Sequence, residues 1–403
     1  MHTSSQQKRV LLTGGRAPVT LDLARQLAAN GHLVFMAESC PDQLCRRSRS
    51  VVRNYVVPKV NEDPDGYIHE LEEIILSEKI DWLIPTCEEL FFVSRGLEAL
   101  QKHCFVFVDS IEKLRRWHSK WDFICLAQEL GFAVPATRLV TTHEEAKAAL
   151  SAPGKWVCKP VFSRFSAKVF FVETARRMQL DEIEWTISEK MRTLSKEDPW
   201  VVQQFLEGQA YCSYSIAKQG QLTAHAVYPV RFTAGQGACI SFEVAHLPEI
   251  DRWVKRFVAS ENVTGQISFD FIVASSGEVY PIECNPRATS GIHLFRVEDR
   301  LDQAFFQDEE RFMGKMIVPH PNHKAMISLA MLSYGLLSIR SWSRVKEWLR
   351  LFTGGQDVVF RFADPQPFFQ QFRLLWWNVK ASRQKRISIL EAATHDIEWN
   401  GRE

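Results

Sequence analysis

Hydrophobic residues in the first third of the chain alternate between the spacing of strands and the spacing of helices. Residues 9–15 form a β-rich run that ends in glycines, and residues 19–30 have apolar side chains at helical intervals. The alternation continues with strand patterns at 32–37, 81–85 and 104–108 and with helix patterns at 67–78 and 88–100. Strands and helices that alternate with short connections are typical of a parallel, doubly wound sheet. The sequence therefore predicts an α/β domain over residues 1–115.

The pattern changes after about Ser110. A helix-like stretch at 120–130 is followed by short strand-like segments separated by turn residues, which predict antiparallel sheets. These segments are 136–142, 156–162, 167–173, 200–206, 210–217, 222–228, 265–273 and 279–285. Beyond residue 300 the chain becomes helical and aromatic. Its longest uncharged stretch, 325–339, is too short to span a bilayer, so we interpret it as a buried helix and predict no transmembrane segment.

Charge and cysteine content narrow the classes of function. The 403 residues contain 49 Lys and Arg against 48 Asp and Glu, and this balance argues against a nucleic-acid binder with a basic footprint. The nine cysteines include no C-x-x-C pair, which argues against a zinc ribbon or a thioredoxin-type site and indicates reduced thiols in a cytoplasmic protein. The N-terminus is polar and lacks the apolar region of a signal peptide.

Two glycines follow the first predicted strand, in the segment Thr13-Gly14-Gly15-Arg16-Ala17-Pro18. The segment lacks the G-x-G-x-x-G spacing of a dinucleotide site, and the chain contains no G-x-x-x-x-G-K-[ST] phosphate loop. A tight turn is the better interpretation of these glycines.

The strongest chemical signal lies in the strand pair 265–285. Asp270 and Glu283 fall on the two strands, and Glu283 and Asn285 are two residues apart, so these two face the same side. Two carboxylates and an amide oxygen are hard ligands that suit Mg²⁺ bound together with nucleotide phosphates. Arg287 is positioned in the sequence to neutralise charge at a transferring phosphoryl group. The alternative is a hairpin with solvated acids, but the neighbouring residues are apolar.

Two lysines precede this strand pair. Lys159 lies inside the apolar segment WVCKPV, where an ammonium group without an anionic partner would be costly. Lys120 opens the helix-like segment KWDFICLAQELGF. Taken alone, Lys120 is better interpreted as an ordinary lysine whose apolar stem is buried and whose charge reaches solvent, whereas Lys159 could be either.

The order of these residues resembles the ATP-grasp superfamily: Lys120, Lys159, Gln203-Gln204-Phe205-Leu206, Asp270 and Glu283-Cys284-Asn285-Pro286-Arg287. The resemblance covers residues 8–300 and implies an α/β (α+β) fold. A Rossmann-like pre-ATP-grasp domain (1–115) would precede a two-lobed ATP-grasp domain (116–300) and a helical C-terminal extension (301–403). The mobile lobe would span about 135–200 and the metal-binding lobe about 200–300.

The resemblance also assigns roles and cofactors. Lys120 and Lys159 would hold the α- and β-phosphates of ATP, and the segment Gln203, Gln204, Phe205 and Leu206 would contact adenine through its backbone. Asp270, Glu283 and Asn285 would bind Mg²⁺, with Mn²⁺ as a second candidate ion. Arg287 would be the catalytic residue that stabilises the transferring phosphate.

Three features depart from the usual pattern of that family. The loop after Lys159 reads Ser163-Arg164-Phe165-Ser166-Ala167 instead of a glycine-rich sequence, so hydroxyl groups such as that of Ser166 would contact phosphate. The usual ribose-binding glutamate position is Ala210, and Glu207 is the candidate substitute. The segment 289–293 would line the acceptor pocket, where His293 is either a ligand or base or an ordinary loop histidine.

These resemblances imply a biosynthetic, ATP-dependent ligase that joins a small-molecule acid to an amine, with an amino acid as the expected amine. Residues 199–215 and 264–287 look similar to the mycosporine-glycine synthases, ATP-grasp ligases that phosphorylate a vinylogous acid. Two alternatives remain, namely a small-molecule kinase that stops at the phosphorylated product and a non-catalytic nucleotide-binding protein. No convincing Ser/His/Asp or Cys/His arrangement appears in the sequence, as expected where no protein nucleophile is required.

The segment 368–388 contains five basic and no acidic residues together with two tryptophans. A basic helix of this type can lie on an anionic membrane surface, which gives a weak prediction of peripheral membrane contact. The favoured interpretation is a helix that docks its aromatic side on the protein core.

Overall fold

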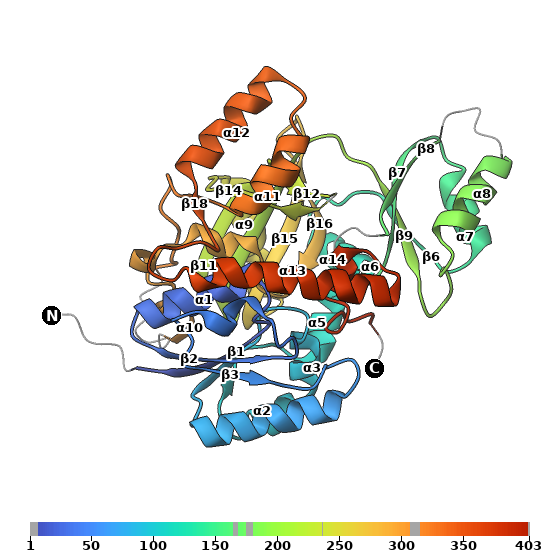
Figure 1. Ribbon diagram of the computed structural model, residues 1–403. Helices are drawn as coiled ribbons and strands as arrows, with labels where there is room; N and C mark the ends of the chain where they lie inside the picture. Colours follow the sequence, from blue (N-terminus) through green and yellow to red (C-terminus); the bar gives the residue numbers. More distant parts are fainter. Residues whose placement is uncertain (1–6, 164–167, 175–179, 236, 307–314, 402–403) are drawn as a thin grey trace. The chain divides into compact units, whose positions relative to one another are not determined.

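The computed structural model describes residues 7–163, 168–174, 180–235, 237–306 and 315–401 (Figure 1). The chain forms two compact units. Unit 1 comprises residues 1–114, 212–268 and 286–398, and unit 2 comprises residues 115–211, 269–285 and 399–403. The domain boundaries expected near residues 115 and 300 stay predictions.

Unit 1 begins with a five-stranded parallel sheet in the order β3-β2-β1-β4-β5. Its strands are β1 (Arg9–Thr13), β2 (Leu33–Glu38), β3 (Arg53–Val56), β4 (Trp82–Ile84) and β5 (Phe105–Val106). Val10 lies opposite both Val34 and Trp82, so β1 is central in the sheet. The predicted doubly wound arrangement is confirmed. Strand β3 escapes prediction because it is a polar edge strand without a buried apolar run.

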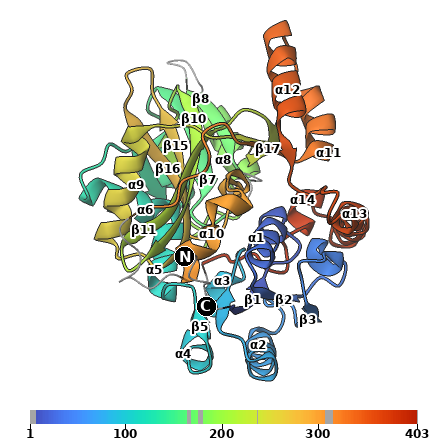
Figure 2. The ribbon, with the colours of Figure 1, turned by 90° about the vertical axis from the view of Figure 1, so that its left-hand side faces the viewer.

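Helices cover both faces of this sheet, with α1 (Pro18–Ala29) on one face and α2 (Pro64–Glu78) on the other (Figures 1 and 2). The remaining elements of this region are η1 (Leu44–Arg47), α3 (Leu90–Arg95), α4 (Leu97–Leu100) and α5 (Ile111–His118). Between β1 and α1 the chain makes a tight turn, in which Gly14 has φ +75° and its carbonyl accepts the Ala17 N–H at 3.0 Å. A Cβ on Gly14 would approach the Thr86 hydroxyl. The positive φ and the nearby Thr86 side chain therefore both favour glycine at position 14, as the tight-turn interpretation expects.

Unit 2 contains the antiparallel sheet β6-β9-β7-β8. Its strands are β6 (Thr137–Val140), β7 (Gly154–Pro160), β8 (Phe170–Thr174) and β9 (Trp200–Gln204), and its helices are α7 (His143–Leu150) and α8 (Leu180–Lys190). Cys158, Trp200 and Val202 are buried and belong to one hydrophobic cluster, so the alternate residues of β7 and β9 face the other side. Lys159 and Gln203 lie on that other side.

A second four-stranded sheet has the order β11-β10-β15-β16. Its strands are β10 (Gln209–Lys218), β11 (Gln221–Pro229), β15 (Gly265–Val273) and β16 (Val279–Asn285), and helices α6 (Lys120–Glu129) and α9 (Pro248–Ser260) complete this part of the chain. The β15–β16 hairpin turns at Gly277, where φ is +86°. Phe269, Phe271 and Cys284 are buried and alternate with Asp270, Glu283 and Asn285 along the two strands. The predicted hairpin with polar and apolar residues in alternation is confirmed.

The C-terminal part of unit 1 is mainly helical, as expected from the sequence, and it also contains two short strands. Strand β17 (Lys324–Met326) pairs with β14 (Ser241–Glu243) on one side and with β18 (Gln356–Asp357) on the other. The remaining elements of unit 1 are β12 (Thr233–Ala234), β13 (Ala238–Cys239), η2 (Ser290–Leu294), η3 (Val297–Asp299), α10 (Leu301–Phe306), α11 (Ser328–Ala330), the π-helical turn η4 (Met331–Gly335), α12 (Trp342–Gly354), α13 (Gln366–Lys385) and α14 (Ile389–Ala392).

The uncharged stretch 325–339 is not the buried helix that its composition predicts. It starts as strand β17 and continues into α11 and η4. Met331 and Gly335 of η4 are buried, but Leu332 of η4 is exposed, as are Leu336 and Leu337, which follow it. Its uniform hydrophobicity concealed this difference between an inner and an outer side. Among the described residues, no helix is both long and apolar enough to cross a membrane.

Helix α13 docks only part of its aromatic surface. Phe368 and Leu374 pack against the core of unit 1. Phe369 and Trp376 project outward and are exposed. The favoured interpretation of segment 368–388 therefore explains one side of the helix and leaves the other unexplained.

The aromatic contact beneath the β15–β16 hairpin gives a stability prediction. Phe269 is fully buried in unit 2 and stacks on Phe123 of α6, with ring centroids 6.0 Å apart. Phe269→Ala removes this contact and leaves a cavity, so we expect the free energy of unfolding of unit 2 to fall by about 3–5 kcal/mol. Urea unfolding followed by circular dichroism measures the change. Phe171→Ala on β8 is the control, because Phe171 is 59% exposed and should cost less than about 1 kcal/mol. Equal losses in the two variants would contradict the packing argument.

Candidate active site

Lys120 is the first residue of helix α6 in unit 2. The Ser119 hydroxyl caps this helix by accepting the Asp122 N–H at 3.2 Å, which fixes where Lys120 leaves the preceding loop. The side chain of Lys120 is buried, and its Nζ donates to the Ser163 carbonyl at 3.0 Å. The same Nζ lies 3.8 Å from Glu283 Oε1. Lys120 therefore points inward to a carboxylate and is not the solvent-reaching lysine of the alternative interpretation.

Lys159 is the second buried lysine of unit 2. It lies on β7, and its Nζ donates to the Ile282 carbonyl on β16 at 3.3 Å. Burial lowers the pKa of Lys159 to about 8, and the charge of Lys120 acts in the same direction, while Glu283 and Asp270 raise it. A buried ammonium group with a depressed pKa is well suited to bind an anion, because an added negative charge favours its protonated form.

The three predicted metal ligands lie on the β15–β16 hairpin. Asn285 Nδ2 is 3.4 Å from Asp270 Oδ2, across the two strands. Glu283 is two residues before Asn285 and faces Lys120. The structure thus brings Lys120, Asp270, Glu283 and Asn285 together in unit 2, as the sequence order predicts.

The donor atoms of this cluster fit Mg²⁺ in type, because carboxylate and amide oxygens are hard ligands. Within the described ranges, no group of three or more His, Cys, Asp or Glu side chains could hold a metal ion. Two carboxylates and one amide suit an ion that completes its shell with phosphate oxygens and water, which is typical of Mg²⁺ at nucleotide sites.

The predicted adenine-binding segment follows the end of β9. The Gln203 side chain is buried and donates to the Thr137 hydroxyl at 2.9 Å. The backbone N–H groups of Gln204 and Phe205 donate to the carbonyls of Ala136 and Lys155 at 2.8 and 2.9 Å. These two N–H groups are already hydrogen-bonded within the sheet. An adenine base would therefore have to be contacted through other backbone groups of the segment, such as those of Leu206.

A cavity of about 470 Å³ lies beside this segment in unit 2. Trp121 and Ile124 of α6, Pro135, Trp156 and Gln204 form part of its wall. Its lining does not include the two buried lysines or the carboxylates of the hairpin. The cavity and the lysine–carboxylate cluster are therefore separate places in unit 2.

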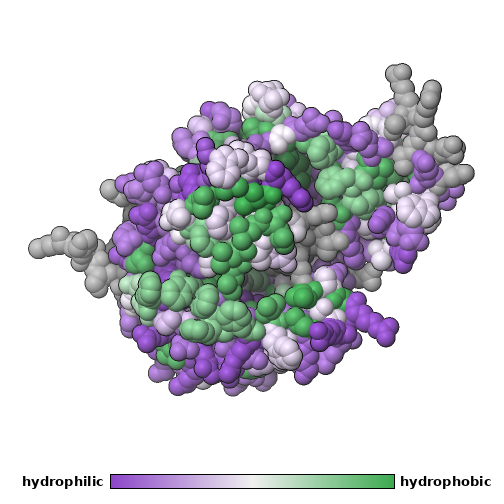
Figure 3. Space-filling model, turned by 45° about the horizontal axis from the view of Figure 1, so that its top comes forward, coloured by the Kyte–Doolittle hydropathy of each residue, from purple (hydrophilic) through white to green (hydrophobic). Residues whose placement is uncertain are grey.

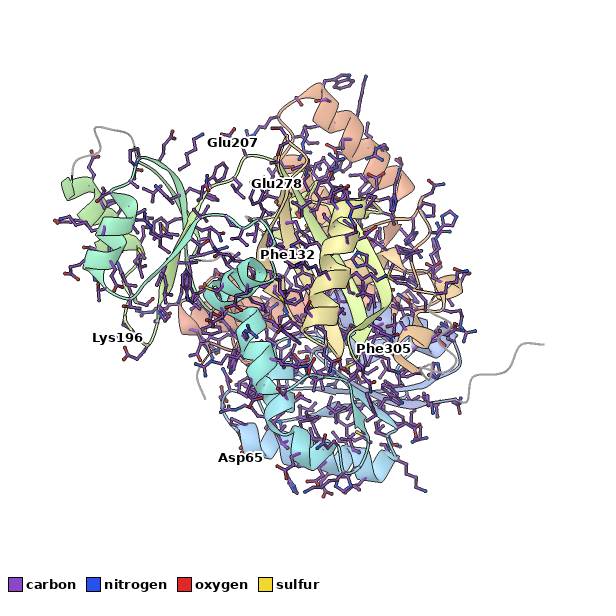
Figure 4. All side chains as sticks on the ribbon, turned by 180° about the vertical axis from the view of Figure 1, so that it is seen from behind. Asp65, Phe132, Lys196, Glu207, Glu278 and Phe305 are labelled. Atoms are coloured by element: carbon purple, nitrogen blue, oxygen red, sulfur yellow. The ribbon has the colours of Figure 1, made fainter. Side chains whose placement is uncertain are left out.

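Glu207 and Ser166 are two further residues that the sequence predicts to contact ATP. Glu207, labelled in Figure 4, has a side chain that is 79% exposed and pairs with Lys155 Nζ at 3.2 Å. This surface ion pair neither supports nor opposes a ribose contact. Ser166 lies outside the described residues.

Arg287 belongs to unit 1 and stands two residues after Asn285 in the chain. Its side chain is mostly buried, with Nε 3.7 Å from Glu88 Oε1, and its Nη1 donates to the Ala288 carbonyl at 3.2 Å. Glu88 follows strand β4 and is buried. A carboxylate beside the guanidinium restricts its position, as expected of an arginine that must be held in one orientation.

His293 serves the structure of unit 1. It is buried, and its Nδ1 lies 2.9 Å from Asp22 Oδ2 on α1. Burial alone would raise the pKa of Asp22, but the hydrogen bond from His293 and the charge of Arg361 lower it below its usual value. This network anchors η2 to α1, so the structural interpretation of His293 is favoured over a ligand or base.

Unit 1 does contain a Ser–His–Asp arrangement, contrary to the sequence-based expectation. Ser215 Oγ lies 2.8 Å from His225 Nδ1, and His225 Nε2 lies 3.2 Å from Asp251 Oδ1. Ser215 is completely buried between neighbouring strands, so no substrate can reach its hydroxyl group. The arrangement satisfies buried polar atoms and is not a nucleophilic site.

Sequence reasoning missed three groups that position the predicted residues, namely Ser119, the Ser163 carbonyl and Glu88. Ser119 carries a readable signal, because a serine before a helical segment is a typical N-cap. Glu88 could have been found from its place after a strand of the doubly wound sheet, where ligand-binding residues gather. The Ser163 carbonyl has no sequence signal, because its role depends on how β7 and α6 pack.

The depressed pKa of Lys159 gives a pH prediction for ATP binding. If Lys159 binds the phosphates of ATP, as the sequence resemblance implies, the free protein loses the Lys159 proton above pH 8 whereas the complex retains it, so ATP affinity should fall by up to about tenfold per pH unit. In Lys159→Arg the cation persists, and the decline should move beyond about pH 10. Titration of a fluorescent ATP analogue between pH 6 and 10 measures both profiles. Lys196→Arg, an exposed lysine of unit 2 labelled in Figure 4, should behave like the wild type. A wild-type affinity that stays constant to pH 10 would contradict the assignment.

Comparison with known proteins identifies the domain. Residues 117–291 match the family model of the ATP-grasp domain. Among solved structures, an L-amino acid ligase from Bacillus licheniformis is similar, with a TM-score of 0.61, 15% identity and 80% of each chain covered. An N5-carboxyaminoimidazole synthetase from Staphylococcus aureus matches with a TM-score of 0.54 and 14% identity over 70% of this chain and 71% of that chain. A biotin carboxylase from Campylobacter jejuni, in a complex with β-γ-ATP, matches with a TM-score of 0.56 and 15% identity over 70% and 66%.

At these identities the structural similarity shows a shared fold. No curated protein matches the sequence. Residues 117–291 are therefore similar to ATP-grasp domains, and the α/β fold class expected from the sequence is confirmed.

Proposed function

We propose that this chain, which carries an ATP-grasp domain, is an ATP-dependent ligase that phosphorylates a small-molecule acid and joins it to an amine. The observation that carries the proposal is the cluster of two buried lysines with Glu283, next to Asp270 and Asn285. A structural core does not need two buried ammonium groups, whereas a polyphosphate does. The L-amino acid ligase among the similar structures supports an acid and an amine as substrates, with an amino acid as the amine.

In this proposal Lys120 and Lys159 bind the phosphates of ATP. Their charges replace part of the water that the phosphates lose on binding, and the hydrogen bonds to Ser163 and Ile282 hold both Nζ atoms in place beforehand. Leu206 and the carbonyls of the segment 203–206 contact adenine. Glu207 is the candidate for the ribose, and the hydroxyl of Ser166 is a candidate for phosphate.

Asp270, Glu283 and Asn285 would hold Mg²⁺ in this site, with Mn²⁺ as a substitute. The ion, when bound with the nucleotide, neutralises phosphate charge and polarises the γ-phosphoryl group. Glu283 also balances the charge of Lys120, so its carboxylate orders both the cationic and the metal-binding parts of the site.

Arg287 is the proposed catalytic residue. Its guanidinium group would stabilise the negative charge that builds up while the γ-phosphoryl group moves to the acid. The proposal for Arg287 rests on its position in the Glu-x-Asn-Pro-Arg segment and on the carboxylate of Glu88 that holds it.

The chemistry explains why no protein nucleophile is needed. A carboxylate or a vinylogous acid reacts slowly with amines because its oxygen is a poor leaving group. Transfer of the γ-phosphoryl group from ATP gives ADP and a phosphorylated acid, and the amine then displaces phosphate to form the C–N bond. The protein contributes positioning and charge stabilisation.

A finer proposal concerns the acid. The resemblance of residues 199–215 and 264–287 to mycosporine-glycine synthases supports a vinylogous acid, such as the enol of a cyclic diketone, as one candidate beside ordinary carboxylates. The cysteine content supports a cytoplasmic location, since nine thiols without a C-x-x-C pair suit a reducing compartment, and the biosynthetic role rests on the resemblance to ligases.

Mass spectrometry of nucleotide and product tests the proposal. The purified protein is incubated with ATP and Mg²⁺ and a panel of acids, including cyclic diketones, crossed with amino acids. ADP together with a condensed product, formed only when acid and amine are both present, is the expected result. ADP with a phosphorylated acid in the absence of an amine requirement would indicate the kinase instead. AMP would contradict the mechanism, and the absence of any turnover over the panel would favour a nucleotide-binding protein.

A further inference from the structure

Exposed hydrophobic side chains concentrate on the C-terminal part of unit 1. Of twenty large hydrophobic residues that are exposed among the described residues, twelve lie between residues 332 and 389. This span is about one seventh of the chain, so the concentration is far above an even distribution. Leu337, Trp342, Phe362, Phe369 and Trp376 have exposed fractions of 60% to 92%. We call these five side chains and their immediate surroundings the C-terminal surface.

The elements that carry this surface project from the same side of unit 1. Figures 1 and 2 show α11, α12 and α13 together on that side, with α13 seen along its axis in Figure 2. In Figure 3 the hydrophobic colour gathers in a continuous area on the face that carries these elements. Helix α13 has twenty residues and is therefore about 30 Å long, enough to lie along an extended flat partner.

The exposed side chains are not needed to fold these helices. The inner side of α12 is already packed, because Trp348 and Leu351 are buried in a cluster with Met331. Trp348 Nε1 also donates to the Met331 carbonyl at 2.9 Å. Helix α13 is likewise anchored through Phe368 and Leu374. The outward residues thus form a second apolar side on helices whose inner side is already packed against the rest of unit 1.

The charge of this region limits the partner. Residues 328–388 contain ten Lys and Arg and three Asp and Glu, whereas the remainder of the chain has more acidic than basic residues. All three acids are directed to internal partners: Glu347 pairs with Arg344 at 2.7 Å, Asp364 with Arg25 at 2.9 Å, and Asp357 accepts the Val359 N–H at 2.7 Å. None of the three is classed as exposed, whereas Arg373, Lys380, Arg383, Lys385 and Arg386 of α13 and its C-cap all are.

We propose that the C-terminal surface docks the protein on an anionic lipid membrane. Exposed aromatic and leucine side chains would enter the interface between headgroups and acyl chains, and the basic side chains of α13 would contact the anionic headgroups. Tryptophan suits such an interface because its ring is apolar and its N–H can bond to water. A second copy of the chain fits less well, because two faces of like charge would repel each other. The inference does not depend on the proposed ligase activity.

Vesicle sedimentation with the full-length protein tests this inference. Vesicles of phosphatidylcholine alone are compared with vesicles that contain about one third phosphatidylglycerol. We expect binding to the anionic vesicles that weakens at high salt, because added salt screens the attraction between the basic residues and the lipid. The triple variant Arg373→Glu, Lys380→Glu, Arg383→Glu should bind at least about a hundredfold more weakly, since loss of each basic residue costs about fivefold and the added negative charges weaken binding further.

The double variant Leu337→Ser, Trp376→Ser tests the apolar contribution and should weaken binding at least about tenfold. Two controls match these variants. Trp185→Ser removes an exposed tryptophan of unit 2, and Arg95→Glu with Lys102→Glu reverses two exposed charges elsewhere in unit 1. Both controls should bind as the wild type does.

Three results would overturn the inference. The first is equal binding, or no binding, to the neutral and the anionic vesicles. The second is anionic-vesicle binding that the surface variants and the controls affect alike. The third is a stable dimer, detected by light scattering, that the double variant converts to a monomer, which would assign the surface to a second copy of the chain.

Discussion

Glu283→Gln is expected to lower turnover about 10³-fold while leaving the fold intact. The substitution keeps the size of the side chain but removes a charge that faces Lys120 and serves as a proposed metal ligand. Loss of a ligand that orders Mg²⁺ and the transferring phosphate should cost several kcal/mol of transition-state stabilisation, and about 4 kcal/mol corresponds to this factor. The rate of ADP formation with the acid and amine found by the substrate panel measures the effect.

A matched control lies in the same hairpin. Glu278, labelled in Figure 4, is exposed near the β15–β16 turn, and Glu278→Gln should keep wild-type turnover. A metal titration separates the proposed role from a structural one. Half-maximal activity of Glu283→Gln should require at least about tenfold more Mg²⁺. Its thermal unfolding should remain cooperative. Residual turnover within tenfold of the wild type at ordinary Mg²⁺ would remove Glu283 from the site.

Arg287→Ala is expected to lower turnover by a factor of about 10² to 10³ and to change ATP affinity only a few fold. A guanidinium group that acts on charge developing in the transition state contributes little to ground-state binding, so kcat falls while Kd for ATP is nearly constant. Single-turnover rates and titration with a fluorescent ATP analogue give the two quantities separately.

Removal of Arg287 also leaves the buried Glu88 with one cation fewer, which can destabilise unit 1. Arg287→Lys keeps the charge and should fold normally, yet it should still lose at least about tenfold in turnover because a lysine cannot reproduce the planar geometry. Arg252→Ala, on the exposed side of α9, is the control for loss of an arginine in unit 1. Wild-type turnover in both Arg287 variants would show that another residue stabilises the phosphoryl group.

Periodicity in the sequence predicted the parts of the fold whose burial alternates regularly. The doubly wound sheet follows from strands such as β1, which is buried on both faces, and the β15–β16 hairpin follows from alternation around Gly277. The same alternation placed Asp270, Glu283 and Asn285 together, because residues two apart on a strand face one side. These features depend on neighbours in sequence or on one turn, so the sequence contains the information.

The sequence did not predict features that depend on packing between distant segments. The stretch 325–339 has a uniform apolar composition, so nothing in it distinguishes the buried Met331 from the exposed Leu337. Strand β17 forms because residues 241–243 offer an edge to pair with. The contacts of Lys120 with Ser163 and Glu283 bring together three separate segments of the chain. The only sequence signal for these contacts was the order of the segments, which resembles that of a known family.

The C-terminal surface illustrates the same limit. The sequence allows segment 368–388 either to dock on the core or to face a membrane. In the structure one side of helix α13 docks on the core and the opposite side is exposed. Phe368 turns inward, whereas Phe369 and Trp376 remain outside. Hydrophobic content alone does not reveal which side has a partner, because that depends on the surface that the rest of unit 1 presents.

The central claim is that the acid is activated by the γ-phosphate of ATP, and isotope transfer tests it most directly. The acid identified by the substrate panel is labelled with ¹⁸O at its reacting oxygen and incubated with ATP, Mg²⁺ and the amine. Because the amine would displace the labelled oxygen together with the phosphoryl group, one ¹⁸O should appear in inorganic phosphate, with ADP as the nucleotide product. Label in AMP, or unlabelled phosphate alongside a condensed product, would contradict the account.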